Sequence, residues 1–304
     1  MSRGLEGRGR FKAAEAAVFA LYGLQTHQRL LDLPEAGISV RVVETGSGAP
    51  TLLLHGFSLA TAHWAPLLAR LPGRRLIALD MPGHGASDGK SFDNTDLRSW
   101  FDTALTAWLT ELGLDSVDVI GHSQGAMLAM FLALDHPERV RQLVTIGTPA
   151  VAFGATVPSL RILGRPRFGP LLLDMPKPGT LYSKLLSNTV GSAAVAAMPD
   201  ELIRATYLAN RRPGFGTTVS SYLREMFRGT DADPPRYVLS DTQLRSLTAP
   251  VTVILGHVEA TKTAAERVAL IPQGWLHPVP GEHEPWFNDL DTCTARISHA
   301  LQTA

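Results

Sequence analysis

The chain has 304 residues, of which 45% are hydrophobic and 18% are charged, a composition typical of a globular protein that can bury a sizeable core. Its 28 Lys and Arg residues are balanced by 28 Asp and Glu residues, so its net charge gives no reason to expect nucleic acid as a partner. A single cysteine, Cys293, excludes an intrachain disulfide framework and a zinc site built from cysteines.

Residues 1–37 are expected to form a helical extension. Basic residues precede the apolar run AAVFALYGL, which spans 16–24 and has the outline of a signal peptide. Glu15 at the edge of this run, and the lack of a small-x-small cleavage motif after it, favour instead an amphipathic helix on the protein body or at a subunit contact. No stretch approaches the roughly 20 apolar residues that a membrane span needs. We therefore expect a cytoplasmic protein without a membrane span.

Short apolar runs alternate with helical patterns along the rest of the chain. The runs predict strands at 38–44, 51–55, 75–80, 117–121, 142–147, 250–256 and 275–280, and the patterns between them predict helices at 61–71, 94–112, 124–135, 262–271 and 289–302. Asp93 and Asn94 are candidate N-caps of the second helix. Most of the strands are continuously apolar, so we expect a mostly parallel sheet that helices cover on both faces. This order predicts an α/β fold with a doubly wound sheet.

The segment 149–236 interrupts this alternation. It has no apolar strand pattern and contains prolines, glycines and helical stretches such as DELIRATYLAN. More than eighty residues are too many for a plain loop, so we expect a helical subdomain inserted between two parts of the core, 38–148 and 237–304. The insertion has 11 Lys and Arg against 6 Asp and Glu. These charges either solvate helix surfaces or attract an anionic part of a substrate.

The stretch GHSQG at 121–125 lies between the apolar run VDVI and an apolar helix pattern. The spacing Gly-x-Ser-x-Gly in a strand–turn–helix setting predicts a nucleophile elbow. In such an elbow Ser123 has a strained backbone conformation that raises its hydroxyl above the strand ends. The N-terminus of the following helix would stabilise developing negative charge. A tight turn that merely contains a serine is the alternative.

A serine hydroxyl needs a base to become nucleophilic, and the base needs an acid to orient it. His283, in VPGEHEPWF, follows the last predicted strand and is the candidate base. The loop after the strand at 250–256 reads GHVEATKT, and its only carboxylate, Glu259, is the candidate acid. Because parallel strands end at one edge of a sheet, these loops should meet there. The histidines expected to make structural hydrogen bonds near the site are His55, His63, His84 and His122.

An oxyanion hole requires two backbone N–H groups that face the same oxygen. Gln124 follows the nucleophile at the start of the helix and offers the first group. The second is expected from Phe57 in HGFSLATAHW, where Gly56 allows the backbone to turn. An ordinary turn at the end of a strand is the alternative.

Together these residues resemble the α/β-hydrolase fold family, in its branch with a helical cap. The resemblance extends from about Ile38 to Leu301, and its specific parts are HGF at 55–57, DMPGHGASD at 80–88, GHSQG at 121–125 and PGEH at 280–283. In this resemblance 149–236 is the cap and the flanking parts are the hydrolase core. The family usually has an aspartate at the position of Glu259.

The resemblance implies a serine hydrolase that forms an acyl-enzyme on Ser123 and cleaves a carboxylic ester, lactone or thioester, with hydrolysis of a diketone C–C bond as a sub-case. It implies no metal and no organic cofactor. Relatives that dehalogenate alkanes or open epoxides have an aspartate where Ser123 stands, so those activities are not expected. The alternative is a hydrolase-fold protein that binds a ligand or catalyses a non-hydrolytic reaction in the same pocket.

A small-molecule substrate with an apolar acyl part is the expected partner. The insertion supplies enough apolar and aromatic side chains for a pocket. These are Phe153, Phe168, Leu171, Leu172, Leu173, Met175, Tyr182, Tyr207, Phe215, Tyr222 and Phe227.

Overall fold

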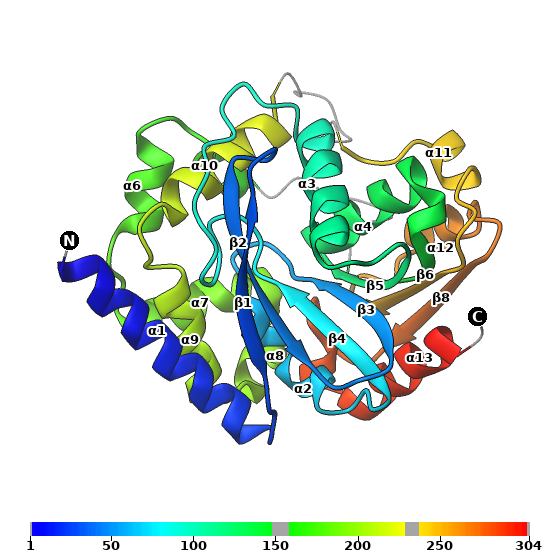
Figure 1. Ribbon diagram of the computed structural model, residues 1–304, viewed down its shortest axis with the longest axis horizontal. Helices are drawn as coiled ribbons and strands as arrows, with labels where there is room; N and C mark the ends of the chain where they lie inside the picture. The colour runs from blue at the N-terminus through cyan, green and yellow to red at the C-terminus, as the bar shows by residue number, and fades with distance from the viewer. Residues whose placement is uncertain (1, 148–157, 229–236, 303–304) are drawn as a thin grey trace.

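An eight-stranded sheet runs through the centre of the molecule (Figure 1). The computed structural model describes residues 2–147, 158–228 and 237–302. The strands are β1 (His27–Leu33), β2 (Ile38–Thr45), β3 (Ala49–Leu54), β4 (Arg74–Leu79), β5 (Val117–His122), β6 (Val140–Ile146), β7 (Val251–Gly256) and β8 (Gly274–Val279). Their order is β1-β2-β4-β3-β5-β6-β7-β8, antiparallel from β1 to β4 and parallel from β4 to β8. The expected mostly parallel sheet is confirmed.

Helices cover both faces of the sheet. One face packs against α3 (Leu97–Glu111), α4 (Gln124–Asp135) and α12 (Lys262–Val268), and the other against α2 (Ala65–Leu68) and α13 (Leu290–Gln302). Within β3, Leu52 and Leu54 face the first group whereas Leu53 faces the second, and all three are fully buried. The continuous apolar runs of the central strands therefore reflect burial on both faces.

The parallel register brings the carboxyl ends of the central strands to one edge. Leu54 of β3 pairs with Gly121 of β5, and His122 pairs with Ile146 of β6. Ile146 pairs in turn with Ile254 of β7, and β8 continues the parallel series. The loops that follow these strands therefore meet at this edge, where open α/β sheets bind ligands.

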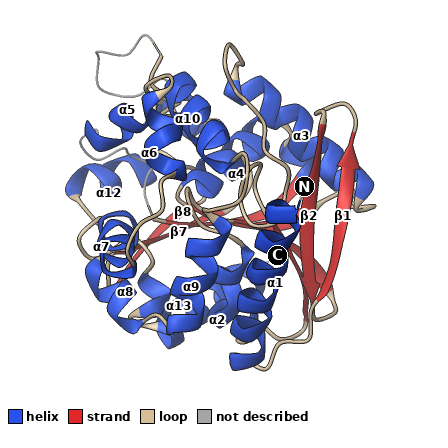
Figure 2. Cartoon of the chain, turned by 90° about the vertical axis from the view of Figure 1, so that its left-hand side faces the viewer, coloured by secondary structure: helices blue, strands red, loops and turns tan. Residues whose placement is uncertain are grey.

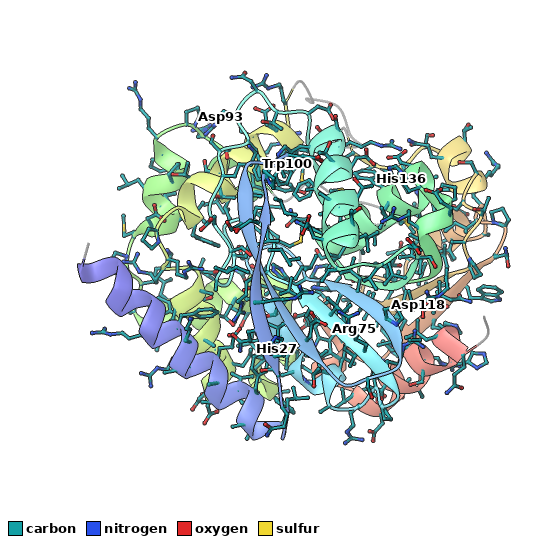
Figure 3. The ribbon with its side chains drawn as sticks, in the orientation of Figure 1. His27, Arg75, Asp93, Trp100, Asp118 and His136 are labelled. Atoms are coloured by element: carbon teal, nitrogen blue, oxygen red, sulfur yellow. The ribbon has the colours of Figure 1, made fainter. Side chains whose placement is uncertain are left out.

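The opposite strand ends carry ion pairs. Asp118, labelled in Figure 3, is the second residue of β5 and accepts hydrogen bonds from the guanidinium groups of Arg74 and Arg141, the latter at 3.1 Å. Arg74 Nε also donates to Thr51 Oγ1 at 2.6 Å. These contacts join β3, β4, β5 and β6 at the end away from the converging loops.

Six helices lie between β6 and β7 in the described part of the chain before the short α11 (Asp241–Arg245). They are α5 (Pro158–Leu163), α6 (Phe168–Asp174), α7 (Gly179–Val190), α8 (Ser192–Ala197), α9 (Asp200–Ala209) and α10 (Phe215–Met226). Figure 2 shows α5, α6 and α10 at the top of the molecule and α7, α8 and α9 in its lower half. Of the upper helices, α10 packs beside α3. Of the lower ones, α9 packs beside the short helix η1 (Thr61–Trp64) and α8 beside η3 (Pro285–Phe287).

The N-terminal residues form a helix and an edge strand. Helix α1 (Ser2–Leu21) packs against α9 (Figure 1), with Val18 and Phe19 buried among residues of both the sheet and the inserted helices. The adjoining β1 pairs with β2 over its whole length. Within the described ranges, no helix has the length and apolar character needed to cross a lipid bilayer.

A buried ionic cluster fixes α1 to the sheet. Arg41 of β2 is 3% exposed, and its Nη2 donates to Glu15 Oε1 of α1 at 2.5 Å and to Thr61 Oγ1 at 2.8 Å. Its Nε donates to Asp80 Oδ2 after β4 at 2.7 Å. Burial alone would raise the pKa of Asp80, but the charge of Arg41 and hydrogen bonds hold it below its ordinary value. Burial raises the pKa of Glu15 although the charge of Arg41 opposes it, so one guanidinium hydrogen-bonds two carboxyl groups that have almost no contact with solvent.

The start of α3 differs from the sequence expectation. Its N-cap is Asp96, whose Oδ1 accepts from Ser99 N at 3.0 Å, rather than Asp93 or Asn94. Asn94 has a φ of 59°, which is not the extended conformation that an N-cap residue adopts.

Candidate active site

Ser123 lies at the junction between β5 and α4 with a φ of 53° and a ψ of −114°. This conformation is strained for a residue with a side chain and persists only where the surroundings enforce it. Ser123 N donates to Ile146 O of β6 at 2.9 Å, and Met127 N donates to Ser123 O at 3.1 Å to begin the helix. The serine is therefore held from both sides at the edge where the loops converge.

The glycines around Ser123 are required by close backbone contacts. A Cβ on Gly125 would lie 2.0 Å from Leu54 O, and one on Gly121 would lie 2.6 Å from the Cα of Ala126. A Cβ on Gly56 would lie 3.1 Å from the Cβ of Ser123. The Gly-x-Ser-x-Gly spacing thus allows the turn to close against the end of β3 and places the loop after β3 directly on the serine.

His283 and Glu259 form a hydrogen-bonded pair between the loops that follow β8 and β7. His283 Nδ1 donates to Glu259 Oε1 at 2.6 Å, and both side chains are largely buried. Glu259 reaches this position because its own N–H donates to Gly256 O at 2.8 Å, which folds the loop back onto β7. Burial lowers the pKa of His283, but the hydrogen bond and charge of Glu259, with the charge of Glu284, raise it more, so the pKa lies above its ordinary value.

The imidazole of His283 lies close to the backbone around Ser123. Its ring centroid is 4.8 Å from that of His122, and a Cβ on Gly147 would lie 3.0 Å from its Cε1. Among the described residues, Ser123 Oγ makes no hydrogen bond with this imidazole. Catalytic hydrogen bonds of this kind are often long before substrate binds, so the arrangement is compatible with a base that engages the serine during reaction.

Two residues next to the elbow carry backbone N–H groups that were predicted to form an oxyanion hole. Gly56 packs against Ser123, which places Phe57 N beside the elbow, and Gln124 N begins α4. Within the described ranges neither group donates to a protein acceptor. Free N–H groups at a helix N-terminus and an adjacent turn suit the stabilisation of a negatively charged oxygen.

The neighbouring histidines are held by structural hydrogen bonds, as expected. His55 Nε2 accepts from Met81 N at 2.9 Å, and His84 Nε2 accepts from Ser58 N at 3.2 Å. His122 Nε2 donates to His283 O at 3.0 Å and so fixes the backbone of that residue. Burial lowers the pKa of His55 to about 3 and also lowers the pKa of His84 and His122. These three rings are therefore neutral near pH 7.

A buried cluster built on Glu284 was not predicted from the sequence. His63 Nδ1 lies 3.0 Å from Glu284 Oε1, and His63 Nε2 lies 2.8 Å from Thr206 Oγ1 of α9. Thr206 gives its hydroxyl hydrogen to Leu202 O at 2.7 Å, so His63 Nε2 must donate to it. The cluster joins the residue after His283 to the inserted helices. Nothing in the sequence signals it, because 221 residues separate His63 from Glu284.

A narrow pocket lies beside the elbow. It has room for about one water molecule. It is lined by Phe57, Met81, Pro82, His84, Phe92, Phe101, Gln124, Thr218, Val219 and Tyr222. Trp100, labelled in Figure 3, packs edge-to-face against Phe92 with ring centroids 5.0 Å apart. The pocket therefore adjoins both of the N–H-bearing residues described above, and its walls are mainly apolar.

The insertion contributes to this pocket through α10 alone among the described residues. Of its side chains that were candidates for an apolar pocket, Tyr222 lines this one, whereas Phe168, Leu171 and Met175 are exposed. Phe153 lies outside the described residues. In the described ranges, no three His, Cys, Asp or Glu side chains converge to hold a metal ion.

Comparison with known proteins identifies similar chains. Residues 50–262 match a family described as alpha/beta hydrolase fold. The chain is 30% identical over 259 residues to a 2-hydroxymuconate semialdehyde hydrolase of Pseudomonas putida, a match that covers 80% of this chain and 83% of that protein. The enzyme of the same name from Pseudomonas sp. (strain CF600) is 33% identical over 189 residues, and the match spans 59% of this chain and 60% of that protein.

Solved structures show the same fold. A carboxylesterase from Bacillus subtilis superposes with a TM-score of 0.72 at 20% identity, over 98% of this chain and 99% of that one. A 2-hydroxy-6-oxo-6-phenylhexa-2,4-dienoate hydrolase from Rhodococcus superposes with a TM-score of 0.74 at 17% identity, over 92% of this chain and 100% of that one. With the extent of the family match, these likenesses lead to one conclusion: the chain belongs to the alpha/beta hydrolase fold family.

Proposed function

We propose that this chain is a serine hydrolase that cleaves a carboxylic ester, lactone or thioester through an acyl-enzyme on Ser123. The observation that carries this proposal is a strained serine at a strand–helix junction, with a histidine–glutamate pair 2.6 Å apart at the same sheet edge. A nucleophile, a base and an orienting acid are the parts that acyl transfer requires. Helices α5–α10 form the cap in this proposal.

The proposed reaction has two halves. Ser123 Oγ forms a bond to the substrate carbonyl carbon while His283 Nε2 takes its proton, and Phe57 N and Gln124 N hold the resulting oxyanion. The bond to the leaving oxygen or sulfur then breaks as His283 returns the proton to it. In the second half, water adds to the acyl carbon and gives a proton to His283. The bond to Ser123 Oγ breaks, the serine recovers that proton, and a carboxylic acid leaves.

Glutamate serves as the acid in this scheme. The usual aspartate is one methylene shorter, and the turn that bonds Glu259 N to Gly256 O sets the backbone back far enough for the longer side chain to reach His283. The carboxylate would stabilise the imidazolium that forms when His283 takes the serine proton.

Hydrolysis of a C–C bond is a second candidate, favoured by the names of the Pseudomonas relatives. Those names describe carboxylate-bearing substrates. The described residues that line the pocket beside the elbow include neither Lys nor Arg, and burying an unpaired carboxylate is costly. The uncharged lining therefore favours a neutral group over a carboxylate beside the elbow, which places ester hydrolysis first.

Hydrolysis of p-nitrophenyl butyrate tests the proposal. The native chain is expected to release p-nitrophenolate with steady turnover, and Ser123→Ala is expected to release none above the uncatalysed rate. Circular dichroism establishes that both proteins are folded. Turnover retained in Ser123→Ala would contradict the proposal, as would a folded native chain that hydrolyses no ester, lactone or thioester in a panel.

The proposed mechanism also predicts how the rate of this hydrolysis depends on pH. His283 acts as a base only when neutral, and its pKa lies above the ordinary value. We therefore expect kcat/KM to be low in acid and to rise with pH through an inflection above 6.5. Measurement of kcat/KM between pH 5 and 9 in buffers of constant ionic strength checks this, and an inflection well below 6.5 would contradict it.

A further inference from the structure

The residues on either side of His283 are both held by inserted helices. Before the histidine, Glu282 Oε2 accepts from Ala193 N near the start of α8 at 2.9 Å. After it, Glu284 N donates to Val190 O at the end of α7 at 3.3 Å. The loop that carries the histidine is therefore joined to the junction between α7 and α8 at two points, one on each side of the catalytic ring.

The junction between α7 and α8 fits closely against Glu282. Gly191 lies at this junction with a φ of 107°, which glycine adopts without strain. A Cβ on Gly191 would lie 2.2 Å from Glu282 Oε2 and 2.5 Å from Glu282 Cβ. The contact therefore includes the backbone of the junction as well as one hydrogen bond, and a larger residue at this position would push Glu282 away.

The Glu284 cluster, which consists of Glu284, His63 and Thr206, ties the same loop to a third helix. Glu284 Oε1 lies 3.0 Å from His63 Nδ1, and His63 Nε2 donates to Thr206 Oγ1 of α9 at 2.8 Å. These three residues are at most 2% exposed. Breaking the cluster leaves a buried polar atom without a partner, so it favours a single position of Glu284 relative to α9.

The core alone does not fix the reacting nitrogen of His283. His122 Nε2 donates to His283 O at 3.0 Å, and His283 Nδ1 donates to Glu259 Oε1 at 2.6 Å. Among the described residues, His283 Nε2 makes no hydrogen bond. Its distance from Ser123 therefore depends on how the loop on either side of the histidine is held.

We propose that α7, α8 and α9 hold His283 in its catalytic position, through Glu282 on one side and the Glu284 cluster on the other. This inference rests on the proposed serine hydrolase function. A displacement of about 1 Å in a catalytic group can cost a hundredfold in rate, so helices that hold this loop contribute to turnover itself. Glu282 and the Glu284 cluster are positioning residues, because they act through His283.

Paired substitutions of Glu282 test this role. Glu282→Ala removes the acceptor for Ala193 N, Glu282→Gln keeps an acceptor oxygen there, and both remove the charge. We expect Glu282→Ala to lower kcat for p-nitrophenyl butyrate by at least about tenfold with KM little changed, because the base is displaced while substrate binding is not. Glu282→Gln is expected to keep kcat close to the native value.

Thr206→Val and Thr206→Ser test the Glu284 cluster in the same way. Valine has the shape of threonine but leaves His63 Nε2 without an acceptor, whereas serine keeps the hydroxyl. We expect Thr206→Val to lower both kcat and the second-order rate constant for phosphonylation of Ser123 by a fluorophosphonate. Thr206→Ser should restore both. Phosphonylation requires the base but no acyl-group binding, so a fall in both rates separates base positioning from substrate recognition.

Ser221→Ala is the matched control. Ser221 is buried in α10, donates to Thr217 O at 2.8 Å and accepts from Phe92 N of the core at 2.9 Å. Its loss therefore also breaks a buried hydrogen bond between an inserted helix and the core, but at α10 rather than at α7, α8 or α9. We expect both rates to be unchanged, even where urea unfolding shows a loss of stability similar to that of Thr206→Val.

The outcomes separate this inference from the proposed function. A folded Glu282→Ala or Thr206→Val protein that retains both native rates would overturn the inference and leave the serine hydrolase standing. Equal losses of rate in Ser221→Ala would also overturn it. If Thr206→Val does not fold, the contrast between Glu282→Ala and Glu282→Gln decides alone. A folded native chain that shows neither turnover nor phosphonylation would remove the hydrolase proposal, and this inference with it.

Discussion

Glu259→Gln is expected to lower kcat for ester hydrolysis by a factor on the order of 10³ to 10⁴, with the fold unchanged. Glutamine cannot stabilise the imidazolium that forms on His283, and its amide hydrogens favour the wrong tautomer of the ring. Steady-state kinetics on p-nitrophenyl butyrate measure the loss. The acid inflection should also move to lower pH, because burial still lowers the pKa of His283 and the opposing contribution of Glu259 is gone.

Glu266→Gln is the control for this substitution. Glu266 lies on α12 shortly after the Glu259 loop and is 63% exposed, with its carboxylate 3.6 Å from Lys262 Nζ. Removing this surface charge should leave both kcat and the pH profile unchanged. A loss below tenfold in Glu259→Gln, or an unmoved acid inflection, would show that Glu259 is not the acid of a catalytic triad.

Arg41→Met is expected to lower the free energy of unfolding by about 3–5 kcal/mol. The substitution leaves Glu15 and Asp80 buried without a cation, and Glu15 is 1% exposed and Asp80 is 0% exposed. Urea unfolding followed by circular dichroism measures the change. Because Glu15 belongs to α1, limited proteolysis should also cut the N-terminal helix faster in this variant.

Arg70→Met is the matched surface control. Arg70 and Asp291 form an ion pair 3.1 Å apart, with side chains 56% and 83% exposed, and such pairs contribute less than about 1 kcal/mol. Adding Glu15→Gln to Arg41→Met should recover part of the lost stability, since one unpaired charge is then removed. Equal losses in the free energy of unfolding for Arg41→Met and Arg70→Met would show that the buried cluster stabilises the fold no more than a surface ion pair does.

The sequence predicted best those elements whose residue pattern has a single physical cause. The central strands are buried on both faces, so their apolar runs were visible without knowledge of their neighbours. The edge strand β1 was missed because half of its side chains face solvent and its alternation, with Leu31 and Leu33 buried, is short. The start of α3 was misplaced because three residues near it, Asp93, Asn94 and Asp96, are all good N-caps by type, and only backbone geometry separates them.

The residues of the candidate site likewise include some that the sequence predicts and some that it does not. Ser123, Glu259 and His283 each follow a recognisable strand, and the parallel register is what brings their loops to one edge. Glu284 appeared in the sequence only as a neighbour of His283. Its pairing with His63 joins two loops far apart in the sequence, and the contact of His63 with Thr206 depends on how α9 packs, which no local pattern encodes.

The most direct test of an activated serine is intact-mass analysis after treatment with a fluorophosphonate. The native chain is expected to gain the mass of one phosphonyl group, with loss of fluoride, and Ser123→Ala and His283→Ala are expected to gain none. A Ser123-specific adduct that requires His283 is the result that the account predicts. A folded native chain that remains unmodified, or an adduct that persists in Ser123→Ala, would contradict it.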